Sequence, residues 1–364
     1  MMFFNSFHNK EHIVLYFCIK NIHSQEEMKT EIEERVLHFL QPAGTSRGVY
    51  TERHIWLVRI IDGEREGVGE CAPLPQLSCD DIQDYTYRLH QLCKEIESCG
   101  CIDMAVARHY PSMLFGLETA MIRLHHGERM YDTPFTRGEE GIPINGLVWM
   151  GSYEEMSERI EQKLSQGFDC VKLKIGAIDF DAELSLLKMI RSRYSRKYIQ
   201  LRVDANGAFC PDDAMKKLNQ LSRYDLHSIE QPIRAGQWQQ MSWLCRNSPV
   251  PIALDEELIG ANDSETRREL LREIRPSYIV LKPSLHGGIS GCNDWISQSK
   301  GLGIESWITS ALESNIGLSA IAQYCSWVYG SGFSMPQGLG TGMLYSDNTP
   351  STTEVRGNKL WYVE

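Results

Sequence analysis

Five charged side chains recur at a nearly regular interval in the second half of the chain. Each one ends a short apolar run that is typical of a buried strand, and consecutive members are 30, 26, 25 and 27 residues apart. They are Lys174, Asp204, Glu230, Asp255 and Lys282. Because an interval of this length accommodates one strand and one helix, the pattern predicts successive strand–helix units of a parallel β/α barrel.

The chemistry of these five side chains also predicts a function. In a parallel barrel the C-terminal ends of all strands meet at one rim, and the active sites of this fold form there. Carboxylates gathered at one rim can bind a divalent cation, and neighbouring lysines can transfer protons. The sequence therefore predicts a metal-assisted active site.

Side-chain alternation adds a sixth residue to this site. Successive side chains of a strand point to opposite faces, so Lys172 and Lys174 share one face of the strand predicted at 170–174. We expect both lysines to enter the barrel interior, while Val171 and Leu173 point outward to the helices.

The chain is long enough for two domains. Its 364 residues allow a barrel of roughly 200–250 residues and a smaller domain. The predicted fold class is α/β, a modified TIM (β/α) barrel preceded by an α+β capping domain. We place the capping domain at residues 28–128, the barrel at 140–340, and at 341–364 a C-terminal segment that packs back on the capping domain.

Local patterns place the elements within these domains. Capping-domain strands are expected at 36–43 and 54–63 around a polar loop, with helices at 80–98 and 112–126. Ser152 and Glu155 have the spacing of a capping box and predict a helix after the first barrel strand. Barrel strands are expected at 142–149, 170–174, 201–204, 227–230, 252–255, 278–282, 303–309 and 332–336.

Residues 1–27 differ from the rest of the chain. Their apolar run at 13–19 is too short to span a bilayer, and no small-residue cleavage site follows it. We expect this stretch to be an extension, or the product of an upstream start codon, ahead of a functional chain that begins at Met28.

Composition excludes several classes of partner. The formal net charge is -11 and the pI is about 5.5, whereas nucleic acids and anionic membranes attract basic surfaces. We therefore expect neither a nucleic-acid nor a membrane partner. The eleven cysteines show no CxxC pairs, which favours reduced thiols in a cytoplasmic protein over a disulfide framework or a zinc ribbon.

The segments around the five side chains resemble one known family, the muconate-lactonizing branch of the enolase superfamily. They are KLK at 172–174, VDAN at 203–206, IEQP at 229–232, ALDEE at 253–257 and LKPS at 281–284. The resemblance extends from about Met28 to the C-terminus. Other segments resemble one dehydratase of this branch: PAGTSRGV at 42–49, GECAPLP at 69–75, SALESNIG at 310–317 and GLGTGMLYSDN at 338–348.

The resemblance implies the removal of a proton next to a carboxylate group with the help of Mg²⁺, with Mn²⁺ as the alternative. The implied metal ligands are Asp204, Glu230 and Asp255. Asn206, two residues beyond the first ligand, would hydrogen-bond close to the metal.

The resemblance also assigns roles to the lysines. Lys174 is the implied general base, and Lys282 would lie against the other face of the intermediate. A lysine acts as a base only when it is neutral, so its pKa must fall from ~10.4. Lys172 and the metal favour the neutral form of Lys174, whereas the three carboxylates oppose it.

The implied substrate is a small carboxylate, 2-succinyl-6-hydroxy-2,4-cyclohexadiene-1-carboxylate. It would lose water by syn β-elimination in menaquinone biosynthesis. Arg47 and Ser310 are the expected substrate-binding residues, the first for a carboxylate and the second for the succinyl end.

Two other functions stay open at this point. Lysines on both faces of a substrate also permit a two-base epimerisation, so an N-acylamino acid racemase or a dipeptide epimerase is the alternative. A catalytically silent barrel that acts as a binding module is disfavoured, because all five side chains are present. The sequence does not determine whether the protein is a monomer or a homo-oligomer.

Overall fold

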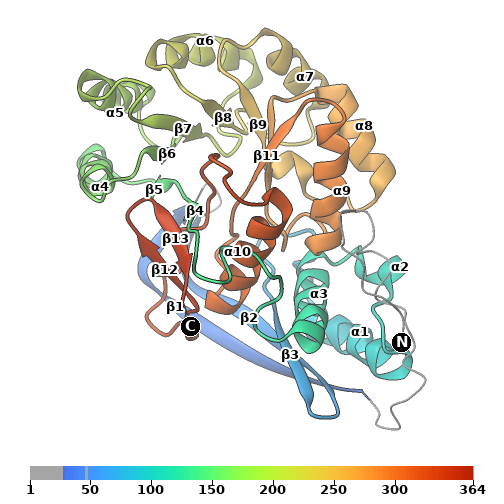
Figure 1. The fold of residues 1–364 in the computed structure, drawn as a ribbon. Helices are drawn as coiled ribbons and strands as arrows, with labels where there is room; N and C mark the ends of the chain where they lie inside the picture. Colours follow the sequence, from blue (N-terminus) through green and yellow to red (C-terminus); the bar gives the residue numbers. More distant parts are fainter. Residues whose placement is uncertain (1–27, 46–47, 364) are drawn as a thin grey trace.

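The computed structural model describes residues 28–45 and 48–363, so the extension predicted at 1–27 lies outside the described residues. The chain first forms an antiparallel sheet in the order β1–β2–β3, blue in Figure 1. Its strands are β1 (Lys29–Thr45), β2 (Gly48–Asp62) and β3 (Arg65–Cys71).

Strands β1 and β2 are longer than the predicted strands at 36–43 and 54–63. The polar stretch 48–53, predicted as part of a loop, belongs to β2 and pairs with β1. Most of its side chains are exposed, and its backbone groups bond across the two-stranded ribbon. A strand therefore forms here without the apolar alternation on which the prediction depended.

Helices α1 (Tyr85–Cys99) and α3 (Pro111–His126) pack on one face of this sheet, with the short α2 (Met104–Ala107) between them. The helix predicted at 112–126 is confirmed by α3. Its contact with β3 depends on glycine, because a Cβ added at Gly69 would lie 1.8 Å from the carbonyl oxygen of Gly116. The backbones of the helix and the strand can approach this closely only without side chains.

The second part of the chain is a curled sheet of parallel strands surrounded by helices, as predicted (Figure 1). Neighbouring strands in this sheet are also consecutive in sequence, which is the arrangement of a β/α barrel. They are β5 (Gly146–Val148), β6 (Cys170–Lys174), β7 (Gln200–Asp204), β8 (Ser228–Glu230), β9 (Ile252–Leu254), β10 (Tyr278–Leu281) and β11 (Glu305–Ile308).

The closing strand of the barrel differs from the prediction. Residues 332–336 form no strand, and single bridges join Gln337 to Ile144 and Gly338 to Thr309 instead. Pro336 lacks an N–H group and Gly332 has a φ of +75°, so the predicted segment cannot extend a ladder. Closure therefore occurs just after it, at 337–338.

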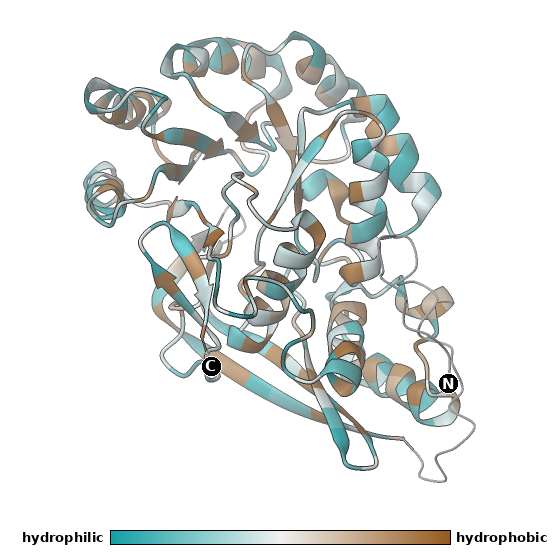
Figure 2. Cartoon of the chain, in the orientation of Figure 1, coloured by the Kyte–Doolittle hydropathy of each residue, from teal (hydrophilic) through white to brown (hydrophobic). Residues whose placement is uncertain are grey.

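The helices on the outside of the barrel carry apolar residues toward the strands. In Figure 2, the strands and the surrounding helices both show brown and teal residues. The predicted capping box is confirmed, because the Ser152 and Glu155 side chains bond each other's backbone N–H. The helices are α4 (Tyr153–Ser165), α5 (Phe180–Arg193), α6 (Pro211–Leu221), α7 (Trp238–Asn247), α8 (Ser264–Ile274), α9 (Gly288–Lys300) and α10 (Asn315–Tyr329).

The C-terminal segment contacts both parts of the molecule. The Leu40 N–H of β1 donates to the Leu344 carbonyl at 2.8 Å, and the rings of Phe39 and Tyr345 lie 4.5 Å apart. Strands β12 (Thr353–Arg356) and β13 (Lys359–Tyr362) form a separate sheet with β4 (Ile142–Pro143). The apolar run predicted as one strand at 142–149 is therefore divided between β4 and β5.

Two glutamates of the first part cap helices of the barrel. Glu70 in β3 accepts the N–H groups of Ser314 and Gly317 at 2.8 Å, at the start of α10. Glu118 in α3 accepts the Ile289 N–H at 2.6 Å, at the start of α9. These carboxyl oxygens accept N–H groups that have no partner within their helices, so both contacts hold the two parts together.

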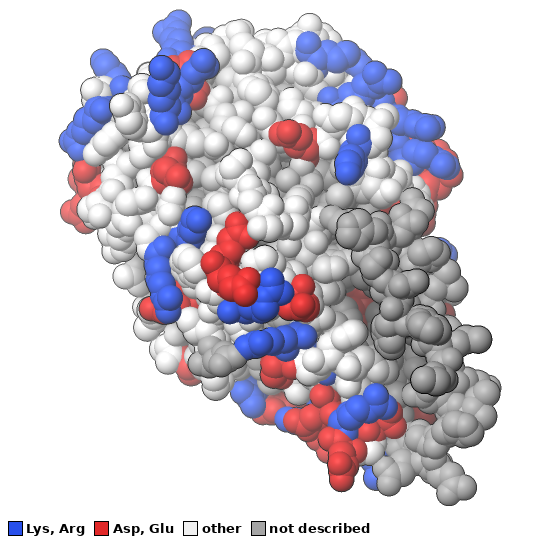
Figure 3. Space-filling model, in the orientation of Figure 1, with Lys and Arg blue, Asp and Glu red and all other residues white. Residues whose placement is uncertain are grey.

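In the part of the chain that the structure describes, no helix combines the length and apolar character needed to cross a bilayer. The apolar helices α3 and α10 have 16 and 15 residues, and about 20 are required. On the face shown in Figure 3, acidic and basic side chains are interspersed. On the antiparallel sheet, for example, Arg59 Nη1 lies 2.6 Å from Glu66 Oε2, and Arg59 Nε lies 3.7 Å from Glu31 Oε2.

Candidate active site

The three predicted carboxylates meet at the C-terminal ends of adjacent barrel strands. Asp204 ends β7 and lies directly opposite Glu230, which ends β8, while Asp255 follows β9. One oxygen from each lies within 4.8 Å of the others, and each residue is at most 1% exposed. The structure thus brings together three side chains of which the outer two, Asp204 and Asp255, are 51 residues apart along the chain.

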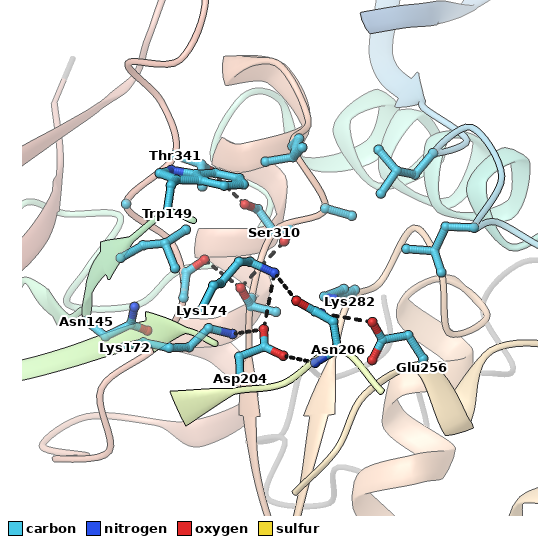
Figure 4. Close-up of a pocket in the computed structure, with 18 of the residues that line it drawn as sticks. Asn145, Trp149, Lys172, Lys174, Asp204, Asn206, Glu256, Lys282, Ser310 and Thr341 are labelled. Atoms are coloured by element: carbon cyan, nitrogen blue, oxygen red, sulfur yellow. Dashed lines mark hydrogen bonds and ion pairs between the residues drawn. The ribbon is translucent and has the colours of Figure 1, made fainter. Parts of the chain in front are cut away.

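The three predicted lysines each contact this carboxylate group. Lys172 Nζ lies 2.5 Å from Glu230 Oε2 and 3.1 Å from Asp204 Oδ2. Lys174 Nζ lies 3.3 Å from Asp204 Oδ2, and Lys282 Nζ lies 2.6 Å from Asp255 Oδ2. Figure 4 shows Lys172 and Lys174 pointing toward Asp204 from the same strand, as side-chain alternation predicts.

Asn206 connects the lysine side of the site to Glu256. Its Oδ1 accepts a hydrogen bond from Lys174 Nζ at 2.7 Å, and its Nδ2 donates to Glu256 Oε1 at 2.9 Å (Figure 4). Its φ of +44° lies in the left-handed region, which asparagine tolerates better than most residues. This conformation directs the amide into the pocket beside Asp204.

Burial and neighbouring charges shift the pKa values of Asp204 and Glu230 in opposite directions. Burial alone would raise the pKa of Asp204, but the charges of Lys172, Lys174 and Lys282 outweigh it and lower that pKa. Burial, reinforced by Asp204 and Asp255, raises the pKa of Glu230 to about 7 against the opposing charge of Lys172. Three carboxylates this close together therefore favour a bound cation.

Two of the lysines beside them, Lys172 and Lys282, are held as cations. Burial would lower the pKa of Lys172, but Asp204, Glu230 and Asp255 raise it well above its usual range. Burial likewise opposes a raised pKa at Lys282, where Asp255 provides the largest upward effect. Both side chains are therefore ammonium groups at neutral pH.

The carboxylates fit a hard divalent cation. Glu230 Oε1 and Asp255 Oδ1 are buried and have no hydrogen-bond partner in the described part of the chain. Buried carboxylate oxygens without a protein partner are costly unless an ion or water satisfies them. Oxygen donors converging in this way are the ligands that Mg²⁺ and similar cations prefer.

The site lies at the bottom of a pocket with a largely apolar wall. Lys172, Lys174, Asp204 and Lys282 line its floor, and the space measures about 900 Å³ with its open mouth included. Apolar and aromatic residues from both parts of the chain form the walls. They are Tyr50, Leu74, Leu77, Leu147, Trp149, Trp307, Ala311 and Leu312. The pocket can therefore hold a small carboxylate with an apolar body.

The two predicted substrate-binding residues have different outcomes. Ser310 lines the pocket, and its Oγ lies 2.6 Å from Thr341 Oγ1. Arg47 lies outside the described residues. The substrate-binding roles of both residues stay predictions.

Three residues that support the site were not predicted. The ring of His286 accepts the backbone N–H of Lys282 at 2.9 Å, and burial lowers the pKa of His286 to about 3, so the ring is neutral. Gln231 Oε1 accepts the Asp255 N–H at 3.2 Å. Trp149, just after β5, places its ring centre 6.0 Å from Lys174 Nζ. Only their positions next to strand ends could have indicated them.

The comparisons with known proteins agree with this architecture. The family model described as "Enolase C-terminal domain-like" matches residues 155–339, and the one described as "MenC, N-terminal domain" matches residues 46–124. The crystal structure of MenC from Desulfotalea psychrophila has a TM-score of 0.79 and 41% identity, and covers 92% of this chain and 100% of that chain.

Sequence relatives of two activities were found. The o-succinylbenzoate synthase of Desulfotalea psychrophila is 46% identical over 358 residues, which cover 89% of this chain and 96% of that protein. The L-Ala-D/L-Glu epimerase of Bacillus subtilis is 26% identical over 295 residues, which cover 77% of this chain and 79% of that protein.

These matches show that the chain belongs to the enolase superfamily. The two matched stretches, 155–339 and 46–124, lie in the barrel and in the capping domain of this chain. Within the superfamily, the chain belongs to the o-succinylbenzoate synthases. The resemblance seen in the strand-end segments and in the SALESNIG and GECAPLP segments is thereby confirmed.

Proposed function

We propose that this protein removes water from 2-succinyl-6-hydroxy-2,4-cyclohexadiene-1-carboxylate and releases o-succinylbenzoate for menaquinone biosynthesis. One observation supports this above all others: three lysines line one pocket together with Asp204, a member of the carboxylate triad, in a chain 46% identical to an o-succinylbenzoate synthase. The reaction breaks a carbon–oxygen bond without hydrolysis, which makes the enzyme a lyase.

Lys174 is the proposed base. Its Nζ lines the pocket and is oriented by Asn206 Oδ1 at 2.7 Å. In its neutral form, Nζ takes the proton from the carbon next to the substrate carboxylate, and the bonding electrons move into the ring. The Lys174 ammonium then returns this proton to the hydroxyl group that leaves from the same face. One water is released and the ring becomes aromatic.

Lys172 and Lys282 are proposed to act through their charge. Lys172 contacts Asp204 Oδ2, as Lys174 does, so its fixed ammonium lies beside the base. Lys282 enters the pocket from β10, four strands away from β6, and would attract the negative π-system of the intermediate.

Asp204, Glu230 and Asp255 are proposed to hold Mg²⁺, with Mn²⁺ as the alternative. The two buried oxygens without protein partners support this assignment. When bound, the ion would receive the substrate carboxylate and stabilise the second negative charge that proton removal creates. Asn206 would keep its place beside the metal through its bond to Glu256.

We also propose that Ser310 hydrogen-bonds the succinyl end of the substrate and that Arg47 faces a carboxylate. Ser310 is supported by its place in the pocket wall. The proposed location is the cytoplasm, without nucleic-acid or membrane partners. The net charge of -11 supports this, as do the cysteines of the described part of the chain, which are all free thiols.

Epimerisation is the second candidate. Lysines from β6 and from the end of β10 line the same pocket, and a relative at 26% identity is an L-Ala-D/L-Glu epimerase. A two-base epimerisation would use Lys174 and Lys282 on opposite faces of the α-carbon. The greater identity to the synthase favours dehydration.

One comparison separates the two functions. The purified wild-type protein with Mg²⁺ is given the cyclohexadiene carboxylate in one assay, and N-succinylamino acids or dipeptides in another. Dehydration is followed by ultraviolet absorbance and epimerisation by optical rotation. We expect fast dehydration that stops in EDTA. Epimerisation without dehydration would instead establish the second candidate.

A further inference from the structure

Arg53, in β2 of the antiparallel sheet, is buried although its guanidinium is permanently charged. It donates to main-chain carbonyl oxygens: Nη2 to Ala72 at 2.7 Å and to Ala311 at 3.4 Å, Nε to Leu312 at 3.3 Å, and Nη1 to Pro73. In the described ranges, no carboxylate lies within ion-pair distance of it. These bonds connect two backbone segments that are more than two hundred residues apart in sequence.

We propose that Arg53 is a positioning residue that sets the spacing of two walls of the substrate pocket, an inference that rests on the proposed function. On one side, Ala72 and Pro73 lead directly into Leu74, which lines the pocket. On the other side, Ala311 and Leu312 themselves line it. Arg53 is not among the pocket-lining residues, so it acts through these two segments.

The second wall needs this support because its backbone is strained. Leu312 has a φ of +64°, a left-handed conformation that is unfavourable for a branched side chain. Its carbonyl oxygen accepts from Arg53 on one side and from the Tyr345 hydroxyl at 2.6 Å on the other. Glu313 fixes the same turn by accepting the Ala311 N–H at 2.7 Å.

The apolar contact across the two walls depends on the same spacing. Leu74, Leu285, Ala311 and Leu312 form one buried cluster, against which Tyr50 and Trp149 of the pocket also pack. Arg53 therefore holds together the apolar surface that a ring-shaped substrate would contact. Because this surface binds the substrate body and does not move protons, losing the spacing should weaken binding more than it slows chemistry.

Arginine is suited to this task and lysine is not. The planar guanidinium offers five donors in a fixed fork, so it can bond carbonyls of both segments at once. A lysine at this position would keep the charge and most of the length, but its donors lie on one atom. Arg53→Lys thus tests the geometry without removing the charge.

Arg123 provides a matched control. It is also buried, and it also joins the antiparallel sheet to the barrel, donating to the Val68 carbonyl at 2.6 Å and the Ile316 carbonyl at 3.3 Å. Neither Arg123 nor these two partners line the substrate pocket. Arg123→Lys should therefore loosen the same interface without moving the pocket walls.

The experiment compares four Mg²⁺-loaded proteins: wild type, Arg53→Lys, Tyr345→Phe and Arg123→Lys. KM and kcat for dehydration are measured together with the Kd for o-succinylbenzoate, from tryptophan fluorescence, and the Tm. For Arg53→Lys we expect KM and Kd to rise about tenfold while kcat stays within about threefold. Tyr345→Phe should raise KM in the same direction, which keeps the test valid if Arg53→Lys does not fold. Arg123→Lys should lower Tm alone.

Two results would overturn the proposal. One is a KM and a product Kd within about threefold of wild type in both Arg53→Lys and Tyr345→Phe. The other is an equal rise of KM in Arg123→Lys, which would mean that any loosening of the interface has this effect. A wild-type protein that neither binds the product nor dehydrates the substrate would instead disprove the proposed function, before any variant is compared.

Discussion

Lys174 and Asn206 are joined across neighbouring strand ends of the barrel by a hydrogen bond of 2.7 Å from Nζ to Oδ1. The amide orientation is fixed from its other end, because Nδ2 donates to Glu256 at 2.9 Å. An amide oxygen accepts a hydrogen bond without adding a charge. Asn206 can therefore orient Lys174 without attracting a proton to it as strongly as a carboxylate would.

This relationship predicts the effect of Asn206→Asp. A carboxylate in place of the amide would favour the ammonium form of Lys174, and the pKa of the base should rise. The alkaline pH at which kcat/KM reaches its plateau should then move up by about one unit or more. The pH–rate profile checks this. Asn206→Ala is the control, and it should lower kcat without moving the pH–rate profile to higher pH. An unchanged profile in Asn206→Asp would contradict the proposed role of Asn206 in orienting Lys174.

Glu230→Gln should weaken metal binding. Glu230 Oε1 is buried without a hydrogen-bond partner in the described residues, and the variant removes one negative charge from the triad. Isothermal titration should show Mg²⁺ affinity reduced at least tenfold, on the order of what metal-site changes cost. Glu257→Gln removes a nearby buried carboxylate that bonds Gln231 and Gly236. Equal weakening in both variants would argue against Glu230 as a ligand.

Lys282→Met should lower kcat by about a hundredfold while leaving a folded protein. The methionine keeps much of the apolar stem but removes the ammonium that lies 2.6 Å from Asp255. Rapid-mixing kinetics and the product Kd would show whether chemistry or binding is affected. A kcat equal to that of the wild type would exclude an electrostatic role in dehydration.

Glu118 should make stability depend on pH. Burial raises the pKa of Glu118 to about 7 from 4.5, against the N–H groups of Ser290 and Ile289, which lower it. Between these values the folded chain holds a proton that the unfolded chain has lost. Its contribution to stability is therefore full below about pH 4.5 and is lost as the pH rises through about 7, and it is worth about 3 kcal/mol at most.

Urea unfolding of Glu118→Gln at pH 5 and pH 8 tests this. The variant cannot lose a proton, so its unfolding free energy should fall less between the two pH values than that of the wild type. The exposed Glu95→Gln should keep the wild-type dependence. Parallel curves for the wild type and Glu118→Gln would contradict the prediction.

The predicted part of the site follows from one physical regularity. Strand ends of a parallel barrel share one rim, so a βα interval in sequence becomes proximity in space, and Asp204, Glu230 and Asp255 meet as expected. Lys172 could be added because strand side chains alternate. These inferences needed no knowledge of how the domains pack.

The residues that could not be predicted depend on long-range packing. Arg53 is a polar residue in a polar stretch, and its burial results from contact with a turn more than two hundred residues away. His286 is significant only through the backbone of Lys282, and closure at Gln337 depends on single bridges without an apolar pattern. Local patterns carry no signal for contacts of this kind.

The central claim, that Lys174 is the base of a dehydration in this pocket, is tested most directly by Lys174→Ala. Single-turnover conversion of the cyclohexadiene carboxylate is measured with Mg²⁺, together with Mg²⁺ affinity and Tm as checks on the folded site. We predict a loss of about a thousandfold or more in rate with metal affinity and Tm retained. A variant that dehydrates the substrate at the wild-type rate would contradict the account.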